Sequence, residues 1–186
     1  MFSMAYRRIF QGLLLVLLDF RIQYFDILPD FLGYILIFRA LGTLAEQHSY
    51  FSKAKPYALV LIFLSLTSIF EVPQTNLLEH SISTQELGWL LLAQGIMILD
   101  VVVLYWICQG IGELAKERSL DELREKARFR WQFYFAVTSV LLVYTPFALN
   151  LDPSWNMLMI PLVILMFWAM VLVLGLVRTA EVELKD

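Results

Sequence analysis

The sequence predicts an all-α fold, a polytopic bundle of about six transmembrane helices forming a single membrane domain over residues 1–186. Two observations predict this class. Hydrophobic residues make up 60% of the chain and charged residues 17%, and the mean hydropathy is +0.70, which exceeds what a soluble core needs. In addition, when the apolar runs are placed across a membrane, the lysines and arginines lie almost entirely on one side of that membrane, as the positive-inside rule requires.

Long apolar runs define the expected spans, which are approximately residues 4–20, 31–47, 56–72, 87–109, 131–149 and 155–178. With the amino terminus in the cytoplasm, an even number of crossings returns the carboxyl terminus there as well. In that arrangement 13 of the 14 basic residues lie at or near the cytoplasmic face and only Arg21 lies opposite. Arg39, inside the second run, fits this arrangement least well. The expected location is therefore the cell (cytoplasmic) membrane, multi-pass, with both termini inside.

The first two spans are short. Residues 4–20 would form roughly 25 Å of helix, against a hydrocarbon core of about 30 Å. Either the two runs within residues 9–45 cross the membrane as short tilted helices, or they form a re-entrant hairpin whose polar tip is buried in the bundle. Both arrangements return the chain to the cytoplasm, so the charge asymmetry does not separate them.

The later spans carry helix-stopping and interfacial residues at their ends. Pro56 is expected to open the third span, and Pro73 to end it. Pro146 is expected to break the helical hydrogen bonding late in the fifth span, most simply as a kink. Tryptophans stand near the outer ends of spans at positions 89 and 155 and near the inner ends at positions 106 and 131, which is typical of aromatic belts.

Residues 113–130 form the largest expected cytoplasmic element. Ser119 followed by Glu122 matches a capping box, so a helix is predicted to begin at Leu120, with Glu122 and Lys126 spaced for an ion pair. This segment is interpreted either as an amphipathic inner-leaflet helix or docking surface, or as a solvated connector that runs into the fifth span.

A docking surface would use Leu120 and Leu123, which mark one face of the predicted segment. Its partner would be another membrane or cytoplasmic protein. Nucleic acid is excluded as a partner because the basic residues of this segment are interleaved with acidic ones. Membrane lipids are the other expected partners.

Polar residues among apolar ones mark the first candidate for an ion or solute route. Asp19, Arg21, Asp26 and Asp30 lie between the first two runs. Asp30 is expected to cap the second helix, and Arg21 to offset Asp19 or to bridge to Asp26. The alternative is that the three carboxylates form an outward-facing cation site.

Asp100 is the second candidate, because it lies near the middle of the fourth span. A charged aspartate at that depth costs roughly 2.5–3.5 kcal/mol, so it should face the bundle interior and be partnered or protonated. Its functional interpretation is proton or cation coupling. Its structural interpretation is an interhelical hydrogen bond, for which the candidate partners are Gln94, Thr138, Tyr144 and Thr145.

No enzyme, cofactor or metal site is predicted. The sequence contains no P-loop, no His-Glu-x-x-His, no Gly-x-Ser-x-Gly and no Gly-x-Gly-x-x-Gly motif after a strand. Cys108 is the only cysteine and is expected to be a small buried apolar residue. His48 and His80 are expected on opposite faces of the membrane and so cannot share a metal.

Residues 26–34 read Asp-Ile-Leu-Pro-Asp-Phe-Leu-Gly-Tyr. This segment resembles an uncharacterised family of small multi-spanning membrane proteins of Gram-positive bacteria, which carry a similar Asp-x-Leu-Pro-Asp-x-x-Gly-Tyr signature after a first apolar run. The resemblance covers about residues 12–42 and implies a cytoplasmic-membrane protein without implying an activity. In length, six spans and cytoplasmic termini the chain also looks like the substrate-binding membrane subunits of energy-coupling-factor vitamin transporters, but their Ala-x-x-x-Ala motif is not evident in the first helix.

Two classes of function follow from these residues. The first is a small transporter or transporter subunit in which Asp100 and the acidic residues from Asp19 to Asp30 lie along an ion or solute route. The alternative is a non-catalytic membrane scaffold or assembly partner that binds another protein through helix faces and residues 113–130. A lipid-modifying enzyme with a divalent metal at the outer carboxylates is the least supported class.

Overall fold

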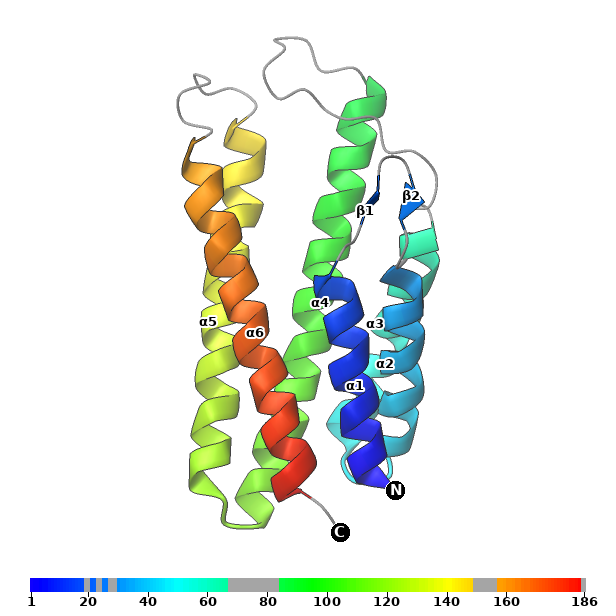
Figure 1. Ribbon diagram of the computed structural model, residues 1–186, viewed down its shortest axis with the longest axis vertical. Helices are drawn as coiled ribbons and strands as arrows, with labels where there is room; N and C mark the ends of the chain where they lie inside the picture. Colours follow the sequence, from blue (N-terminus) through cyan, green and yellow to red (C-terminus); the bar gives the residue numbers. More distant parts are fainter. Residues whose placement is uncertain (19–20, 23–24, 27–29, 67–83, 149–156, 185–186) are drawn as a thin grey trace.

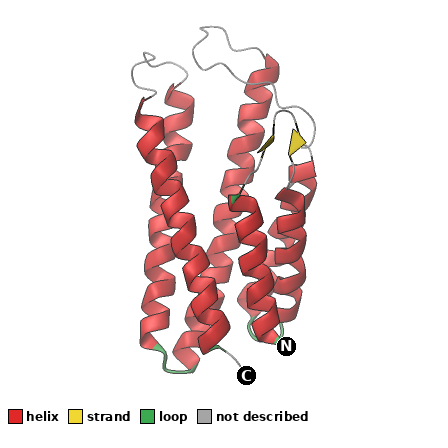
Figure 2. Ribbon diagram, in the orientation of Figure 1, coloured by secondary structure: helices red, strands yellow, loops and turns green. Residues whose placement is uncertain are grey.

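The computed structural model describes residues 1–18, 21–22, 25–26, 30–66, 84–148 and 157–184 (Figure 1). These residues form six helices and two short strands (Figure 2). The helices are α1 (Phe2–Leu17), α2 (Asp30–Leu44), α3 (Ser49–Leu66), α4 (Thr84–Glu117), α5 (Asp121–Ala148) and α6 (Met159–Glu183). The strands β1 (Arg21–Ile22) and β2 (Phe25–Asp26) pair antiparallel between α1 and α2. The prediction of a helical bundle is confirmed.

The six helices form a closed ring. Each helix packs against its neighbours in the sequence, and α6 packs against α1. Successive helices run in opposite directions, so α1 begins and α6 ends at the same end of the bundle (Figure 1). The basic residues of the described helices and turns gather toward this end, except Arg21 on β1 and Arg39, which lies in the second half of α2. We call this end the basic end and the opposite one the far end.

The helices α4 and α5 form a long hairpin at the basic end. The helix α4 has 34 residues, a length of roughly 50 Å, and α5 begins only four positions after α4 ends. Residues 113–130 are therefore the ends of two long helices joined by a tight turn, and the connector interpretation describes them best. Ser119 has a φ of 56°, a left-handed conformation that suits a turn, and α5 starts at Asp121. This corrects the predicted helix start at Leu120.

The ion pair between Glu122 and Lys126 is confirmed. Lys126 donates to the Glu122 carboxylate one turn earlier, and this hydrogen bond lowers the pKa of Glu122. Asp121 and Glu122 also lie in the first turn of α5, where the helix dipole favours negative charge.

Two prolines lie inside helices. The helix α3 begins at Ser49, so Pro56 does not open the third span as predicted. Phe51 and Ala54 are fully buried, and their packing keeps the residues before the proline helical. The helix α5 likewise continues through Pro146, while the hydroxyl of Thr145 donates to the Leu141 carbonyl at 2.8 Å. Packing therefore overrides the helix-breaking tendency of Pro56.

The short helices α1 and α2 approach each other closely at two glycines. A Cβ atom on Gly12 would lie 2.6 Å from the carbonyl oxygen of Gly33, and a Cβ on Gly33 would lie 2.7 Å from that of Gly12. No side chain larger than hydrogen fits between the two backbones, as at small-residue contacts in membrane bundles. Between these helices, the strand register sets Arg21 directly opposite Asp26.

The tightly packed core lies toward the basic end. Along α4 the buried residues begin at Val103, and along α6 they begin at Ala169. Large apolar side chains are exposed around the rest of the bundle, for example Phe63, Leu91, Phe147 and Ile164. Within the described residues, two helices, over residues Leu87–Glu117 and Met159–Glu183, are long and apolar enough to cross a membrane.

Candidate functional site

Asp100 is paired with Tyr34 inside the ring. The Tyr34 hydroxyl lies 2.9 Å from one carboxylate oxygen of Asp100 and 3.0 Å from the other. It can therefore donate its single proton to either oxygen, and it joins α2 to α4 across 66 residues of sequence. Tyr34 is 2% exposed, whereas Asp100 is half-buried.

Further polar groups lie around this pair. Asp30 is one helical turn before Tyr34 on α2, close enough for its charge to act on both Tyr34 and Asp100. Tyr134, on α5, also lies close enough to Asp100 to interact with its charge. Three helices thus contribute to one polar cluster, which we call the Asp100 cluster and define as Asp30, Tyr34, Asp100 and Tyr134.

The packing of the neighbouring helices fixes the position of Tyr34. Gly33 contacts Gly12 of α1, so the backbone of α2 is set at the residue before the tyrosine. On the α5 side, Thr138 donates to the Tyr134 carbonyl at 2.8 Å and lies 3.5 Å from the Met166 sulfur of α6. The cluster is therefore braced on both sides by contacts with the rest of the ring.

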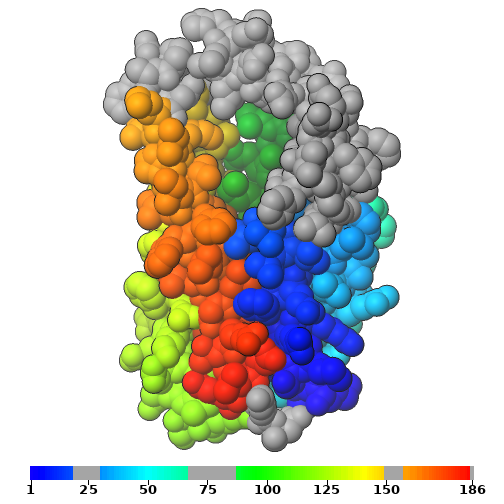
Figure 3. All heavy atoms as spheres, in the orientation of Figure 1, coloured from blue at the N-terminus to red at the C-terminus, as the bar shows by residue number. Residues whose placement is uncertain are grey.

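The Asp100 cluster lies where the packed core ends. On its basic-end side, the fully buried side chains of Ile37, Leu41, Ile107 and other apolar residues fill the ring. On its far-end side, none of the residues 87–102 of α4 is fully buried, and a Cβ atom on Gly88 or Gly95 would meet nothing within 4 Å. Figure 3 shows atoms of α4 (green) within a hollow beside the orange part of α6.

The partner of Asp100 is not among those predicted. The hydroxyls of Thr138 and Thr145 bond to carbonyl oxygens of their own helix. The partner Tyr34 was missed because a tyrosine within an apolar run is usually read as part of the core. A signal was nevertheless present, since Tyr34 follows Asp30 by one helical turn on the same face.

The structure describes only some of the other candidate residues for an ion or solute route. Asp19 lies outside the described residues. Arg21 and Asp26 lie opposite each other in the register of β1 and β2, and Asp30 of the predicted cation site joins the Asp100 cluster. Within the described residues, no group of three or more His, Cys, Asp or Glu side chains could hold a metal ion.

The predicted docking face is part of the core. Leu123 is 1% exposed, and Leu120 packs against the same core cluster. The helix α5 turns these side chains toward its neighbours in the ring, so they do not form a surface open to a partner. This corrects the assignment of Leu120 and Leu123 as docking residues.

No protein-family model, curated protein or solved structure matches this chain.

Proposed function

We propose that this protein crosses the cell membrane six times, with both termini in the cytoplasm. Three features support the proposal: the basic residues gather at the end that holds the termini, large apolar side chains are exposed over the rest of the bundle, and two described helices are long and apolar enough to span a bilayer. The charged ends of α4 and α5 would then protrude from the inner leaflet, because α4 alone exceeds the thickness of a hydrocarbon core of about 30 Å.

We further propose that it is a small transporter, or a subunit of one, in which the Asp100 cluster binds a proton or a cation. The observation that carries this proposal is the hydrogen bond between Tyr34 and Asp100 at the outer limit of the packed core. An aspartate at this depth is costly, and its usual role in membrane proteins is in an ion or proton pathway.

The geometry of the cluster suits reversible binding. Among the described residues, Asp100 accepts hydrogen bonds from one hydroxyl, that of Tyr34, so its carboxylate keeps acceptor capacity for a proton or a cation. Asp30 adds a second negative charge nearby. The far-end side is loosely packed and the basic-end side is closed by apolar side chains, so a bound ion would enter from outside and would need a rearrangement of the helices to leave inward.

Difference infrared spectroscopy on the purified, lipid-reconstituted protein tests this proposal. The carboxyl bands of the wild type and of Asp100→Asn would be compared across pH, and in buffers containing sodium, potassium or neither. We expect a carboxyl band that is lost in Asp100→Asn, responds to pH and shifts when one of the cations is added. Glu46→Gln, which removes an exposed carboxylate from the turn after α2, should leave that band unchanged.

An Asp100 carboxyl group without a spectroscopic response would contradict the transport proposal. If no band assigned to Asp100 responds to pH or cations, and Asp100→Asn only lowers stability, the aspartate is a structural acceptor for Tyr34. The protein would then fit the alternative class, a membrane scaffold or assembly partner.

A further inference from the structure

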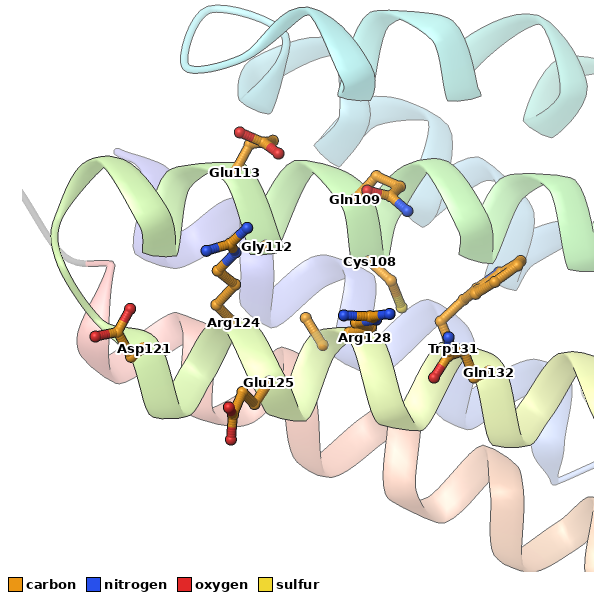
Figure 4. A pocket seen from close by; sticks show the side chains of 11 residues that line it. Cys108, Gln109, Gly112, Glu113, Asp121, Arg124, Glu125, Arg128, Trp131 and Gln132 are labelled. Carbon is orange, nitrogen blue, oxygen red and sulfur yellow. The ribbon is translucent and has the colours of Figure 1, made fainter.

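A polar groove lies between α4 and α5 near the basic end (Figure 4). Its volume is about 630 Å³, within the range of roughly 300–1,000 Å³ that is typical of small-molecule sites. Cys108, Gln109 and Gly112 line it from α4, and the first three turns of α5 line it from the other side. None of these residues belongs to the Asp100 cluster.

Two guanidinium groups extend into this groove. The side chains of Arg124 and Arg128 reach from α5 toward α4, whereas the carboxylate of Glu125 points away from α4 (Figure 4). Neither arginine side chain forms an ion pair or hydrogen bond with the part of the chain that the structure describes. They are one turn apart, so their guanidinium groups can act on one ligand.

The carboxylates that line the groove are divided between paired and unpaired groups. Glu113 forms an ion pair with Lys116 at 3.4 Å. Asp121 and Glu125 have no such partner among the described residues, and Figure 4 shows Asp121 beside the turn that joins the two helices. Because Glu125 points away from α4, the unpaired charges left for a ligand are the two guanidinium groups and the Asp121 carboxylate, which favours a ligand that itself carries both signs over a simple anion.

An aromatic row closes the groove on the side away from the basic end. The Trp131 ring lies 4.9 Å from that of Tyr105 and 5.3 Å from that of Phe135, measured between ring centroids. The row continues through Trp106 to Tyr50 on α3. Rings of this kind gather where lipid headgroups meet acyl chains. Phe135, beyond Trp131, is 46% exposed and so offers apolar surface to an acyl chain.

The charges follow a fixed order along α5. Starting from Trp131 and moving toward the basic end, Arg128 comes about 4.5 Å along the helix axis, Arg124 about 10 Å and Asp121 about 15 Å. A phospholipid with a primary amine has the same order, with acyl chains, then the phosphate, then the ammonium group. Guanidinium groups bind phosphate by paired charge-assisted hydrogen bonds, and carboxylates bind ammonium.

We propose that this groove binds the headgroup of an aminophospholipid from the cytoplasmic leaflet. Arg124 and Arg128 hold the phosphate, and Asp121 holds the ammonium group at the rim. The inference rests on the proposed membrane orientation but not on transport by the Asp100 cluster.

Native mass spectrometry of the purified protein tests this site. Retention of phosphatidylethanolamine, phosphatidylglycerol and phosphatidylcholine with identical acyl chains would be compared. We expect phosphatidylethanolamine to be retained most, and Arg128→Gln to weaken its binding and that of phosphatidylglycerol about tenfold, because a charge-assisted hydrogen bond to the phosphate is lost. The control Arg8→Gln removes an exposed positive charge from the same end on α1, outside the groove, and should retain the wild-type order.

A second variant separates the two charges of the ligand. Asp121→Asn should remove the preference for phosphatidylethanolamine over phosphatidylglycerol while both lipids still bind. The proposal is overturned if the wild type prefers phosphatidylglycerol, if Arg128→Gln retains lipid as well as Arg8→Gln does, or if Asp121→Asn keeps the preference. Soluble phosphoethanolamine that displaces the lipid at equal concentration would also overturn it, by showing that the ligand is not a lipid. Asp100→Asn should leave lipid retention unchanged, so failure of transport and failure of this site are distinguishable.

Discussion

At the scale of single residues, the hydrogen bond between Tyr34 and Asp100 explains how two polar side chains are accommodated inside the bundle. Both residues lie in largely apolar stretches of their helices, and the Tyr34 hydroxyl supplies one hydrogen bond to the carboxylate. A buried carboxylate that lost its donor would retain the cost of leaving water without compensation. The phenol is therefore important for stability as well as for any ion that the carboxylate binds.

Tyr34→Phe should lower the free energy of unfolding by about 1–2 kcal/mol, since it removes one interhelical hydrogen bond and leaves the ring in place. Unfolding of the detergent-solubilised protein by a denaturing detergent measures this change. Tyr57→Phe removes a hydroxyl from a tyrosine that is 37% exposed, and it should have little effect. Equal stabilities of the two variants would show that the Tyr34 hydroxyl contributes nothing to folding.

At the scale of elements, the contact between α1 and α2 explains the two glycines. Gly12 and Gly33 bring the two backbones together just before Tyr34, so the helix contact and the site share one segment of α2. The same principle recurs between α3 and α4, where the ring of Phe51 covers Gly110. Glycine is needed at these positions for lack of space and not for its backbone freedom.

Gly12→Ala should destabilise the protein by about 1–3 kcal/mol, because its Cβ atom would clash with the Gly33 carbonyl and force α1 away from α2. Gly95→Ala is the matched control, since a Cβ there meets nothing within 4 Å. The control should be neutral or stabilising by up to about 1 kcal/mol, because alanine favours a helix over glycine. The same denaturation experiment compares the two. A neutral Gly12→Ala would mean that the helices are not in close contact at this point.

At the scale of the whole molecule, an antiparallel ring of six helices places both ends of the chain and the connections α2–α3 and α4–α5 at the basic end. The opposite ends of the described helices, which carry few basic residues, lie at the far end. This separation is what a bilayer with positive-inside orientation selects.

Cysteine labelling of intact cells tests that orientation. In a Cys108→Ser background, we expect Met157→Cys at the far end to react with a membrane-impermeant maleimide, because residue 157 would face outward. Glu117→Cys at the basic end should react only after the membrane is permeabilised. The background protein without cysteine should not react at all. Labelling of Glu117→Cys but not of Met157→Cys in intact cells would reverse the proposed orientation.

The sequence by itself determined the helical class, the approximate position of each helix and the separation of charge, because these depend on local composition and on residues near each helix end. It also singled out Asp100 and Asp30 as polar residues in costly positions. It did not determine the extent of α3 around Pro56, since packing of residues such as Phe51 overcomes local preference.

Only the tertiary structure decided which helices are neighbours and which side chains meet. Helices that are apolar on most sides carry no pattern that selects one neighbour, so the contact between Gly12 and Gly33, the closure of α6 on α1 and the choice of Tyr34 as partner of Asp100 could not be predicted. The groove between α4 and α5 has the same origin. Its charges are visible in the sequence, but their convergence depends on how two long helices pack.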